Sequence, residues 1–157
     1  QAQLRVQSIK KDKMVPVKDF FVGPGKTVLN ADEMVTEIHI PIPPPRTYCA
    51  FQKIGRVYDD IAILNASVQL QFDASLTCTS ASIAMGAVGP TVGQAHKAEE
   101  MLIGQKLNQD LIRNAARQAA QESSPISDVR ASEKYRRTTI QVIVERALMD
   151  VFQKLQS

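Results

Sequence analysis

The chain changes its hydrophobic period once, and this change limits the folds that it can adopt. Residues 64–72 alternate between apolar and polar side chains, and residues 77–88 repeat the alternation less strictly. A period of two residues with one apolar face indicates half-buried strands of an antiparallel sheet. Residues 47–55 form a further extended segment before them. The apolar positions are Leu64, Ala66, Val68, Leu70 and Phe72 in the first alternating segment, and Ala81, Ile83, Met85 and Ala87 in the second.

From residue 94 onward the apolar residues recur every three to four positions, which predicts three helices. The first is short and ends at Gly104, the second follows a cap at Asn108, and the third is long and follows a cap at Ser132. Strands followed by helices predict an α+β fold, in which an antiparallel sheet of three to four strands packs on three C-terminal helices. We interpret the apolar stripe of the last helix as a core face rather than a coiled-coil seam. This stripe contains Ile140, Val144, Ala147, Leu148, Val151 and Leu155.

Three consecutive prolines divide the chain, because they can continue neither a sheet nor a helix. Residues 1–45 then form one part and residues 46–157 another. The first part is predicted to be rich in strands: residues 1–9 and 14–17 form a hairpin around a Lys/Asp turn, and residues 35–40 are extended. The chain opens in mid-strand without an initiator methionine, so we expect it to be a piece of a longer polypeptide.

Composition argues against several functional classes. The 157 residues are 44% hydrophobic and 22% charged, as in an ordinary globular protein, and the net charge of +3 is spread along the chain. With 5% aromatic residues and no tryptophan, stacking surfaces for nucleic acid are few, so no nucleic-acid partner is expected. No apolar run reaches membrane-spanning length and the N-terminus does not read as a signal peptide, so we expect a cytoplasmic protein. Cys49, Cys78, His39 and His96 stand apart from one another, so no metal site is predicted.

Residues 20–29 contain the run Gly-Pro-Gly-Lys-Thr, which invites comparison with a phosphate-binding loop. That motif requires a glycine five positions before Gly25, where this chain has Phe20. Pro24 also lacks the backbone N–H that a phosphate would need. We therefore predict a Gly/Pro turn between two extended segments, with Lys26 in solvent.

The loop at residues 52–62 holds the densest group of polar and charged side chains. Two adjacent aspartates after a Gly-Arg turn are more typical of a solvated turn than of a catalytic pair. Successive strand residues also point to opposite faces, which keeps the two carboxylates apart. The residues by themselves therefore identify no function. They are Lys53, Arg56, Tyr58, Asp59 and Asp60.

Four motifs occur in a characteristic order along the chain. They are Phe-Phe-x-Gly followed by Thr27, Arg-x-x-x-Asp-Ile-Ala at residues 56–62, Gly-Ala-Val-x-Pro at 86–90, and Asp-x-Arg-x-Ser-x-x-Tyr-Arg-Arg at 128–137. In this order they resemble the C-terminal half of the FAD-binding (medium) subunit of molybdenum hydroxylases, the xanthine dehydrogenase and aerobic carbon monoxide dehydrogenase flavoprotein family. The resemblance extends over nearly all of the chain.

The resemblance implies a component of a molybdenum-containing oxidoreductase. In such enzymes a molybdopterin centre oxidises the substrate, 2Fe-2S clusters carry the electrons, and FAD passes them to an acceptor. An iron–sulfur subunit and a molybdopterin-binding subunit are the implied partners, in a hetero-oligomer that dimerises. Residues 1–45 would be the tail of an FAD-binding domain whose phosphate-binding loops lie in a missing N-terminal half. Residues 46–157 would be the carbon monoxide dehydrogenase flavoprotein-like C-terminal domain, and the chain by itself would be inactive.

The resemblance also implies which residues lie near the flavin. A lysine contacts the flavin from the position of Gln52 or of Lys53, so Lys53 is the expected contact, and Val35 matches an aliphatic position that packs against the cofactor. The charged loop that follows affects the approach of the acceptor, and no catalytic residue is implied. The alternative is a non-catalytic module that docks partner subunits and binds no FAD by itself. The expected cofactor-binding residues are Val35, Gln52, Lys53, Arg56, Tyr58, Asp59 and Asp60.

Overall fold

The computed structural model describes residues 2–57 and 59–156, in two compact units. Unit 1 comprises Gln1–Pro43 and unit 2 comprises Pro44–Ser157. The division falls within the run of three prolines, which have fixed backbone φ angles and no N–H to donate. No helix formed by the described residues is long and apolar enough to cross a membrane.

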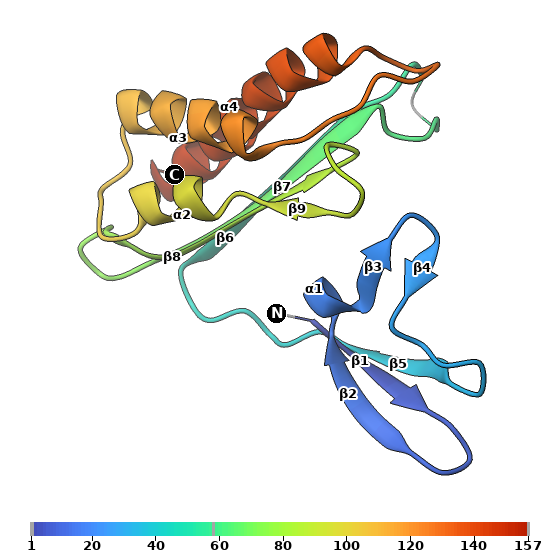
Figure 1. Ribbon diagram of the computed structural model, residues 1–157. Helices are drawn as coiled ribbons and strands as arrows, with labels where there is room; N and C mark the ends of the chain where they lie inside the picture. Colours follow the sequence, from blue (N-terminus) through green and yellow to red (C-terminus); the bar gives the residue numbers. More distant parts are fainter. Residues whose placement is uncertain (1, 58, 157) are drawn as a thin grey trace. The chain divides into compact units, whose positions relative to one another are not determined.

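Unit 1 is built from two small antiparallel sheets (Figure 1). Strands β1 (Gln3–Gln7), β2 (Asp12–Pro16) and β5 (Met34–His39) form the larger sheet in the order β2-β1-β5. The predicted hairpin is therefore present, with its second strand two residues earlier than predicted. A single helical turn, α1 (Val17–Phe20), follows β2 and was not predicted. Gln1, which the prediction included in the first strand, lies outside the described residues.

The core of unit 1 lies on one face of the larger sheet. Leu4 and Val6 of β1 point to this face and are buried together with Phe20 of α1. On the opposite face, Arg5 donates hydrogen bonds to Asp12 at 2.6 Å and to Glu37 at 2.8 Å, and so links the three strands across the sheet. The alternation of β1 between an apolar and a charged face explains both contacts.

The Gly-Pro-Gly run forms the turn of a two-stranded hairpin, as the sequence predicts. Strands β3 (Phe21–Gly23) and β4 (Lys26–Thr27) pair antiparallel on either side of it. Gly25 has a φ of 65°, in the left-handed region that glycine adopts without steric cost. No helix follows the turn, so it lacks the helix N-terminus that holds the phosphates in a phosphate-binding loop.

Unit 2 consists of a four-stranded antiparallel sheet with three helices over one of its faces (Figure 1). This arrangement confirms the predicted α+β fold class. The strands, in the spatial order β6-β7-β8-β9, are β6 (Thr47–Ile54), β7 (Leu64–Phe72), β8 (Cys78–Gly86) and β9 (Gly93–Gln94). The helices are α2 (His96–Leu102), α3 (Gln109–Glu122) and α4 (Glu133–Gln156).

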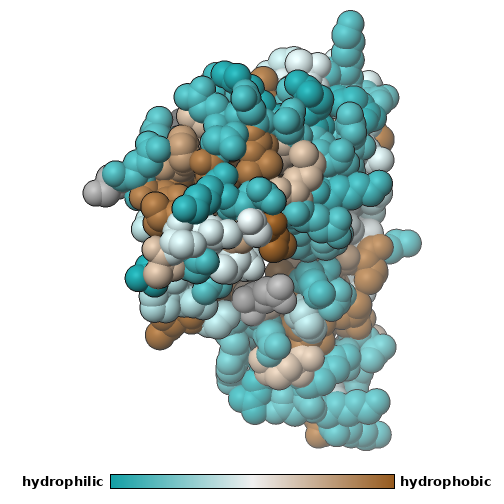
Figure 2. All heavy atoms as spheres, turned by 90° about the vertical axis from the view of Figure 1, so that its left-hand side faces the viewer, coloured by the Kyte–Doolittle hydropathy of each residue, from teal (hydrophilic) through white to brown (hydrophobic). Residues whose placement is uncertain are grey.

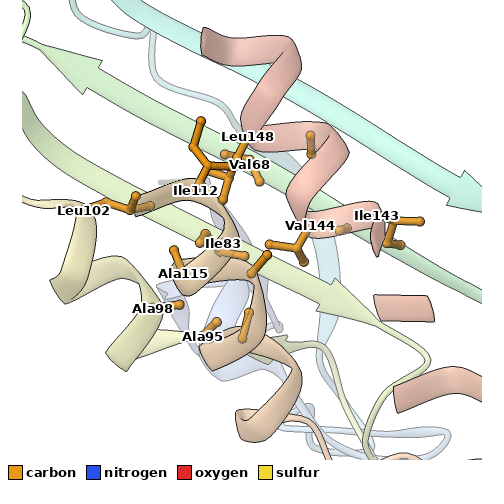
Figure 3. Close-up of a cluster of buried hydrophobic side chains, with 14 of the residues drawn as sticks. Val68, Ile83, Ala95, Ala98, Leu102, Ile112, Ala115, Ile143, Val144 and Leu148 are labelled. Carbon is orange, nitrogen blue, oxygen red and sulfur yellow. The ribbon is translucent and has the colours of Figure 1, made fainter. Parts of the chain in front are cut away.

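The two faces of this sheet differ in character. On the helix-covered face, the five apolar residues of β7 that the sequence singles out are between 0% and 3% exposed. They meet apolar side chains from β8 and from all three helices, and Figure 3 shows Val68 and Ile83 of the sheet beside Ile112 and Leu148 of the helices. We call the other side the open face. Its residues on the first three strands are Thr47, Cys49, Phe51 and Lys53, then Asn65, Ser67, Gln69 and Gln71, and then Ser80, Ser82, Ala84 and Gly86.

The surface of the molecule seen in Figure 2 is mostly hydrophilic, with hydrophobic areas between the polar ones. Exposed hydrophobic side chains are common on folded proteins because polar groups cannot cover the whole surface. On the open face of unit 2, Phe51 is 61% exposed, whereas its neighbours on β7 are polar.

Side-chain caps hold the helices of unit 2 in place. Asn108 Oδ1 accepts a hydrogen bond from the N–H of Leu111 at 2.9 Å, and Ser132 Oγ accepts one from the N–H of Tyr135 at 3.2 Å, which confirms both predicted caps. Glu122, at the end of α3, accepts from two N–H groups of the first turn of α2, each at 3.0 Å. The buried carboxylate of Glu99 accepts from the N–H of Ile83 at 2.7 Å and so joins α2 to β8.

Strand ends differ from the predicted ones where tertiary contacts intervene. Strand β8 was predicted to run to Val88 but ends at Gly86, since Ala87 has a left-handed φ of 60°. The guanidinium of Arg136, only 5% exposed, donates to the carbonyl of Ala87 at 3.1 Å and to Asp128 at 2.7 Å. Strand β7, in contrast, has the predicted limits, Leu64–Phe72. The short strand β9 was not predicted, because two residues are too few to show an alternation of apolar and polar side chains.

We expect Asn108→Ala to lower the stability of unit 2 by about 1 kcal/mol, because it removes the acceptor for the first turn of α3. Urea unfolding followed by circular dichroism measures this change. Gln109→Ala, at an exposed neighbouring position, is the matched control and is expected to stay within about 0.5 kcal/mol of the wild type. Equal stabilities for the two variants would contradict the capping role.

Candidate functional site

The polar loop predicted as a site connects β6 to β7 and is closed by its own residues. Arg56 Nε donates to Asp60 Oδ2 at 2.7 Å. Asp60 Oδ1 accepts from the N–H of Ile61 at 2.8 Å, and the Asp60 N–H donates to the carbonyl of Val57 at 3.2 Å. Asp60 therefore holds the loop through both its carboxylate and its backbone, as expected for an aspartate in a turn.

Electrostatics keep both members of this pair charged. The hydrogen bond and the positive charge of Arg56 hold the pKa of Asp60 below its ordinary value, although partial desolvation of the carboxylate opposes the shift. In return, Asp60 raises the pKa of Arg56. The Arg56 side chain is 73% exposed and that of Asp60 is 19% exposed, so solvent screens the pair from one side only.

The same loop lines an open depression of ≈ 500 Å³. Its described lining residues are Arg56, Val57, Asp59 and Asp60. Val57 is 69% exposed, so an apolar side chain stands among the charged ones. Tyr58, which the sequence analysis included in the site, lies outside the described residues. The depression offers a guanidinium, two carboxylates and an aliphatic group to a molecule that approaches the loop.

Gln52 and Lys53, the two candidates for the flavin contact, point to opposite sides of the sheet. The Gln52 amide donates to Asp150 of α4 at 2.6 Å, so Gln52 faces the helices. Lys53 is exposed on the open face and pairs in register with Asn65 of β7. Of the two, only Lys53 can reach a ligand on the open face.

Val35, the remaining predicted site residue, belongs to unit 1. It lies in β5 opposite Val6 and packs, partly buried, against the core of that unit. Within unit 2, the structure brings Arg56, Asp59 and Asp60 together in one loop, with Lys53 at the end of the strand that leads into it.

Asn65 was not among the predicted site residues, because its position opposite Lys53 follows from strand register. A signal was available, since Asn65 is a polar member of the alternating segment and lies close to the loop. The register between β6 and β7, however, depends on where the loop turns, and the turn positions were not predicted. Within residues 2–57 and 59–156, no group of three or more His, Cys, Asp or Glu residues could hold a metal ion.

Two family models match this chain, one for each unit. Residues 49–151 match the CO dehydrogenase flavoprotein C-terminal domain, and residues 1–43 match the FAD binding domain in molybdopterin dehydrogenase. The first match covers more than half of the chain. The chain therefore belongs to the family of the CO dehydrogenase flavoprotein C-terminal domain, which confirms the resemblance seen in its motifs.

Individual relatives agree with this assignment. The chain is 29% identical over 147 residues to the 6-hydroxypseudooxynicotine dehydrogenase complex subunit alpha of Paenarthrobacter nicotinovorans, covering 94% of this chain and 50% of that protein. It is 30% identical over 136 residues to the carbon monoxide dehydrogenase medium chain of Afipia carboxidovorans, covering 87% and 47%.

Among solved structures, carbon monoxide dehydrogenase from Hydrogenophaga pseudoflava superimposes with a TM-score of 0.91 at 27% identity. The match covers 98% of this chain and 53% of that one. The chain thus spans about half the length of the relatives that it matches.

We expect Asp60→Asn to lower the Tm of unit 2 near pH 7, because the ionised carboxylate of Asp60 closes the β6–β7 loop. The folded-state pKa of Asp60 is depressed, so its contribution is present above the ordinary aspartate pKa of about 3.9 and is lost as the pH falls through the lower folded-state value. The difference in Tm from the wild type should therefore shrink below about pH 4. Asp59→Asn, in the same loop and exposed, is the control. If both variants melt alike at every pH, Asp60 does not hold the loop.

Proposed function

We propose that the chain is part of the FAD-binding subunit of a molybdenum hydroxylase, an oxidoreductase related to xanthine dehydrogenase, and that this subunit passes electrons from iron–sulfur clusters through FAD to an acceptor. The observation that carries the proposal is that both units match, in order, two domains of flavoproteins of this kind. Under this proposal residues 1–45 are the tail of the FAD-binding domain and residues 46–157 are the C-terminal domain.

The residues of unit 2 suit a flavin edge contact. FAD supplies the redox chemistry when bound, while the protein places the ring and sets the charge around it. A cation next to the N1 and C2 carbonyl edge of the ring stabilises the charge that reduction adds. We assign the direct contact to Lys53, which is exposed on the open face, and the support of the loop to Arg56 and Asp60. Asp59 and Val57 line the depression that an electron acceptor would approach.

The phosphates of FAD need a different part of the subunit. The Gly23–Gly25 turn is a hairpin with a proline in its centre, so it does not present the run of N–H groups that holds a pyrophosphate. In unit 1, Val35 supplies an aliphatic surface against which the cofactor can pack.

The proposed partners are an iron–sulfur subunit and a molybdopterin-binding subunit, in a complex that dimerises. Both cysteines of residues 1–157 are free thiols and unit 2 buries one of them, so iron–sulfur clusters would have to be bound outside these residues. Free thiols also fit a reducing compartment, and we place the protein in the cytoplasm.

Purification of the endogenous complex tests this function. We expect the complete subunit to carry FAD in an equimolar ratio to polypeptide, as measured by absorbance. We also expect it to co-purify with iron and molybdenum, as measured by elemental analysis. The polypeptide of residues 1–157 expressed alone is expected to hold FAD weakly, because it lacks a phosphate cradle. A complete subunit that is colourless, monomeric and free of both metals would instead support a module that only docks partners.

In the complete subunit, we expect Lys53→Ala to shift the flavin potential and to slow flavin reduction or re-oxidation by about 1–3 kcal/mol in activation free energy, because it removes a cation near the developing charge. Its melting temperature should stay close to that of the wild type, since an exposed strand-end lysine is not part of the core. Potentiometry and stopped-flow absorbance measure the two effects. Lys97→Ala removes an exposed cation on α2 and is the charge-matched control. Unchanged potential and rates for Lys53→Ala would move the flavin contact to another residue.

A further inference from the structure

Three residues on the open face of unit 2 lie in one row across the sheet, next to the candidate loop. Lys53 of β6 pairs in register with Asn65 of β7, and Asn65 pairs in register with Gly86 of β8. Directly opposite residues of an antiparallel pair have Cβ atoms about 5 Å apart and project from the same face. Lys53 and Asn65 therefore present their side chains side by side, at the end of the sheet where the loop of Arg56 and Asp60 begins.

The Asn65 carboxamide lies flat over Gly86. A Cβ atom built on Gly86 would stand 2.5 Å from Asn65 Oδ1, 2.6 Å from Nδ2 and 2.8 Å from Cγ. Any other residue at position 86 would therefore displace the amide, since the three atoms nearest to the added Cβ all belong to Asn65. Gly86 is the last residue of β8, and its lack of a side chain leaves room for this amide.

The amide in this position retains its hydrogen-bonding capacity. No residue among 2–57 and 59–156 forms a hydrogen bond with the Asn65 side chain, although the side chain is half-buried. A carboxamide carries two donors on its nitrogen and an acceptor on its oxygen. It is thus a polar group on the open face, in the same row of residues as Lys53.

This pair of groups matches one kind of ligand edge. The pyrimidine side of an isoalloxazine ring alternates carbonyl oxygens with an N–H. A protein that binds this edge therefore needs both a hydrogen-bond donor and an acceptor. It also needs a cation near the carbonyl that gains charge on reduction. We propose that the Asn65 carboxamide, seated on Gly86, is a second flavin contact that recognises this edge together with Lys53. The inference rests on the proposed function, because it assigns a residue to the same cofactor.

A purely structural role for Asn65 makes a different prediction. If the amide only fills the space above Gly86, its loss changes the stability of the fold and leaves the flavin as it was. If the amide contacts the flavin, its loss changes flavin affinity and potential, and a displaced amide has the same effect as a missing one. The Gly86→Ala substitution displaces the amide and leaves Lys53 in place, so it separates the two roles.

The experiment uses the complete subunit with Asn65→Ala, Gly86→Ala and the double variant. Flavin affinity is measured by titrating the apoprotein with FAD and following fluorescence quenching, and the potential is measured on the loaded protein. We expect each single variant to bind FAD roughly three- to tenfold more weakly, the effect of one neutral hydrogen bond. The double variant should bind no more weakly than Asn65→Ala, because Gly86→Ala acts only through the amide. Gln69→Ala, an amide on the same face of the same strand four residues away, is the control and should bind as the wild type does.

Thermal melts of the apoproteins accompany the titrations. Affinities for Asn65→Ala and Gly86→Ala equal to those of the wild type and of Gln69→Ala, in a subunit that binds FAD, would overturn the inference and leave the proposed function intact. Additive losses in the double variant would also overturn it, since Gly86 would then act independently of Asn65. A wild-type subunit that binds no FAD would refute the proposed function itself.

Discussion

The structure of unit 2 depends on the burial of one face of β7. This central strand pairs with β6 on one side and β8 on the other, and its five alternate apolar residues belong to one core with side chains of all three helices, of which α4 packs directly on the strand. A slip of one residue would exchange Val68 for Ser67 or Gln69 in the core, so the hydrophobic effect sets the register strongly. The same register determines that Lys53, Asn65 and Gly86 stand in a row on the opposite face. The core therefore positions the candidate site without contributing a residue to it.

The end of the sheet next to the loop is held by a buried cation. Arg136, in the first turns of α4, donates to the carbonyl of Ala87 and to Asp128, and so ties the end of β8 to the helix and to the segment before it. A buried guanidinium is stable only when it is paired, and here Asp128 supplies the charge. Because Ala87 directly follows Gly86, this network also determines where the strand carrying Gly86 ends.

The two faces of the sheet in unit 2 have different chemistry and therefore different roles. Apolar residues and helices cover one face and supply the stability, while the other face carries mostly polar side chains, with Phe51 as an exposed apolar one. The proposed flavin contacts lie on the second face and in the β6–β7 loop, where a change of residue does not open a cavity in the core. Gln52 illustrates the separation. It is adjacent to Lys53 in sequence, but its amide donates a hydrogen bond to Asp150 of the long helix.

The sequence by itself determined the α+β class, the limits of β7, the caps at Asn108 and Ser132, and the hairpin at Gly23–Gly25, because each follows from local periodicity or from the conformational limits of single residues. Its motifs also identified the family that the comparisons confirm. Only the tertiary structure decided that Gln52 turns inward and Lys53 outward, that Arg136 ends β8, and that Asn65 rests on Gly86. These features depend on the register between strands distant in sequence and on a helix that packs across them, and no local pattern encodes either.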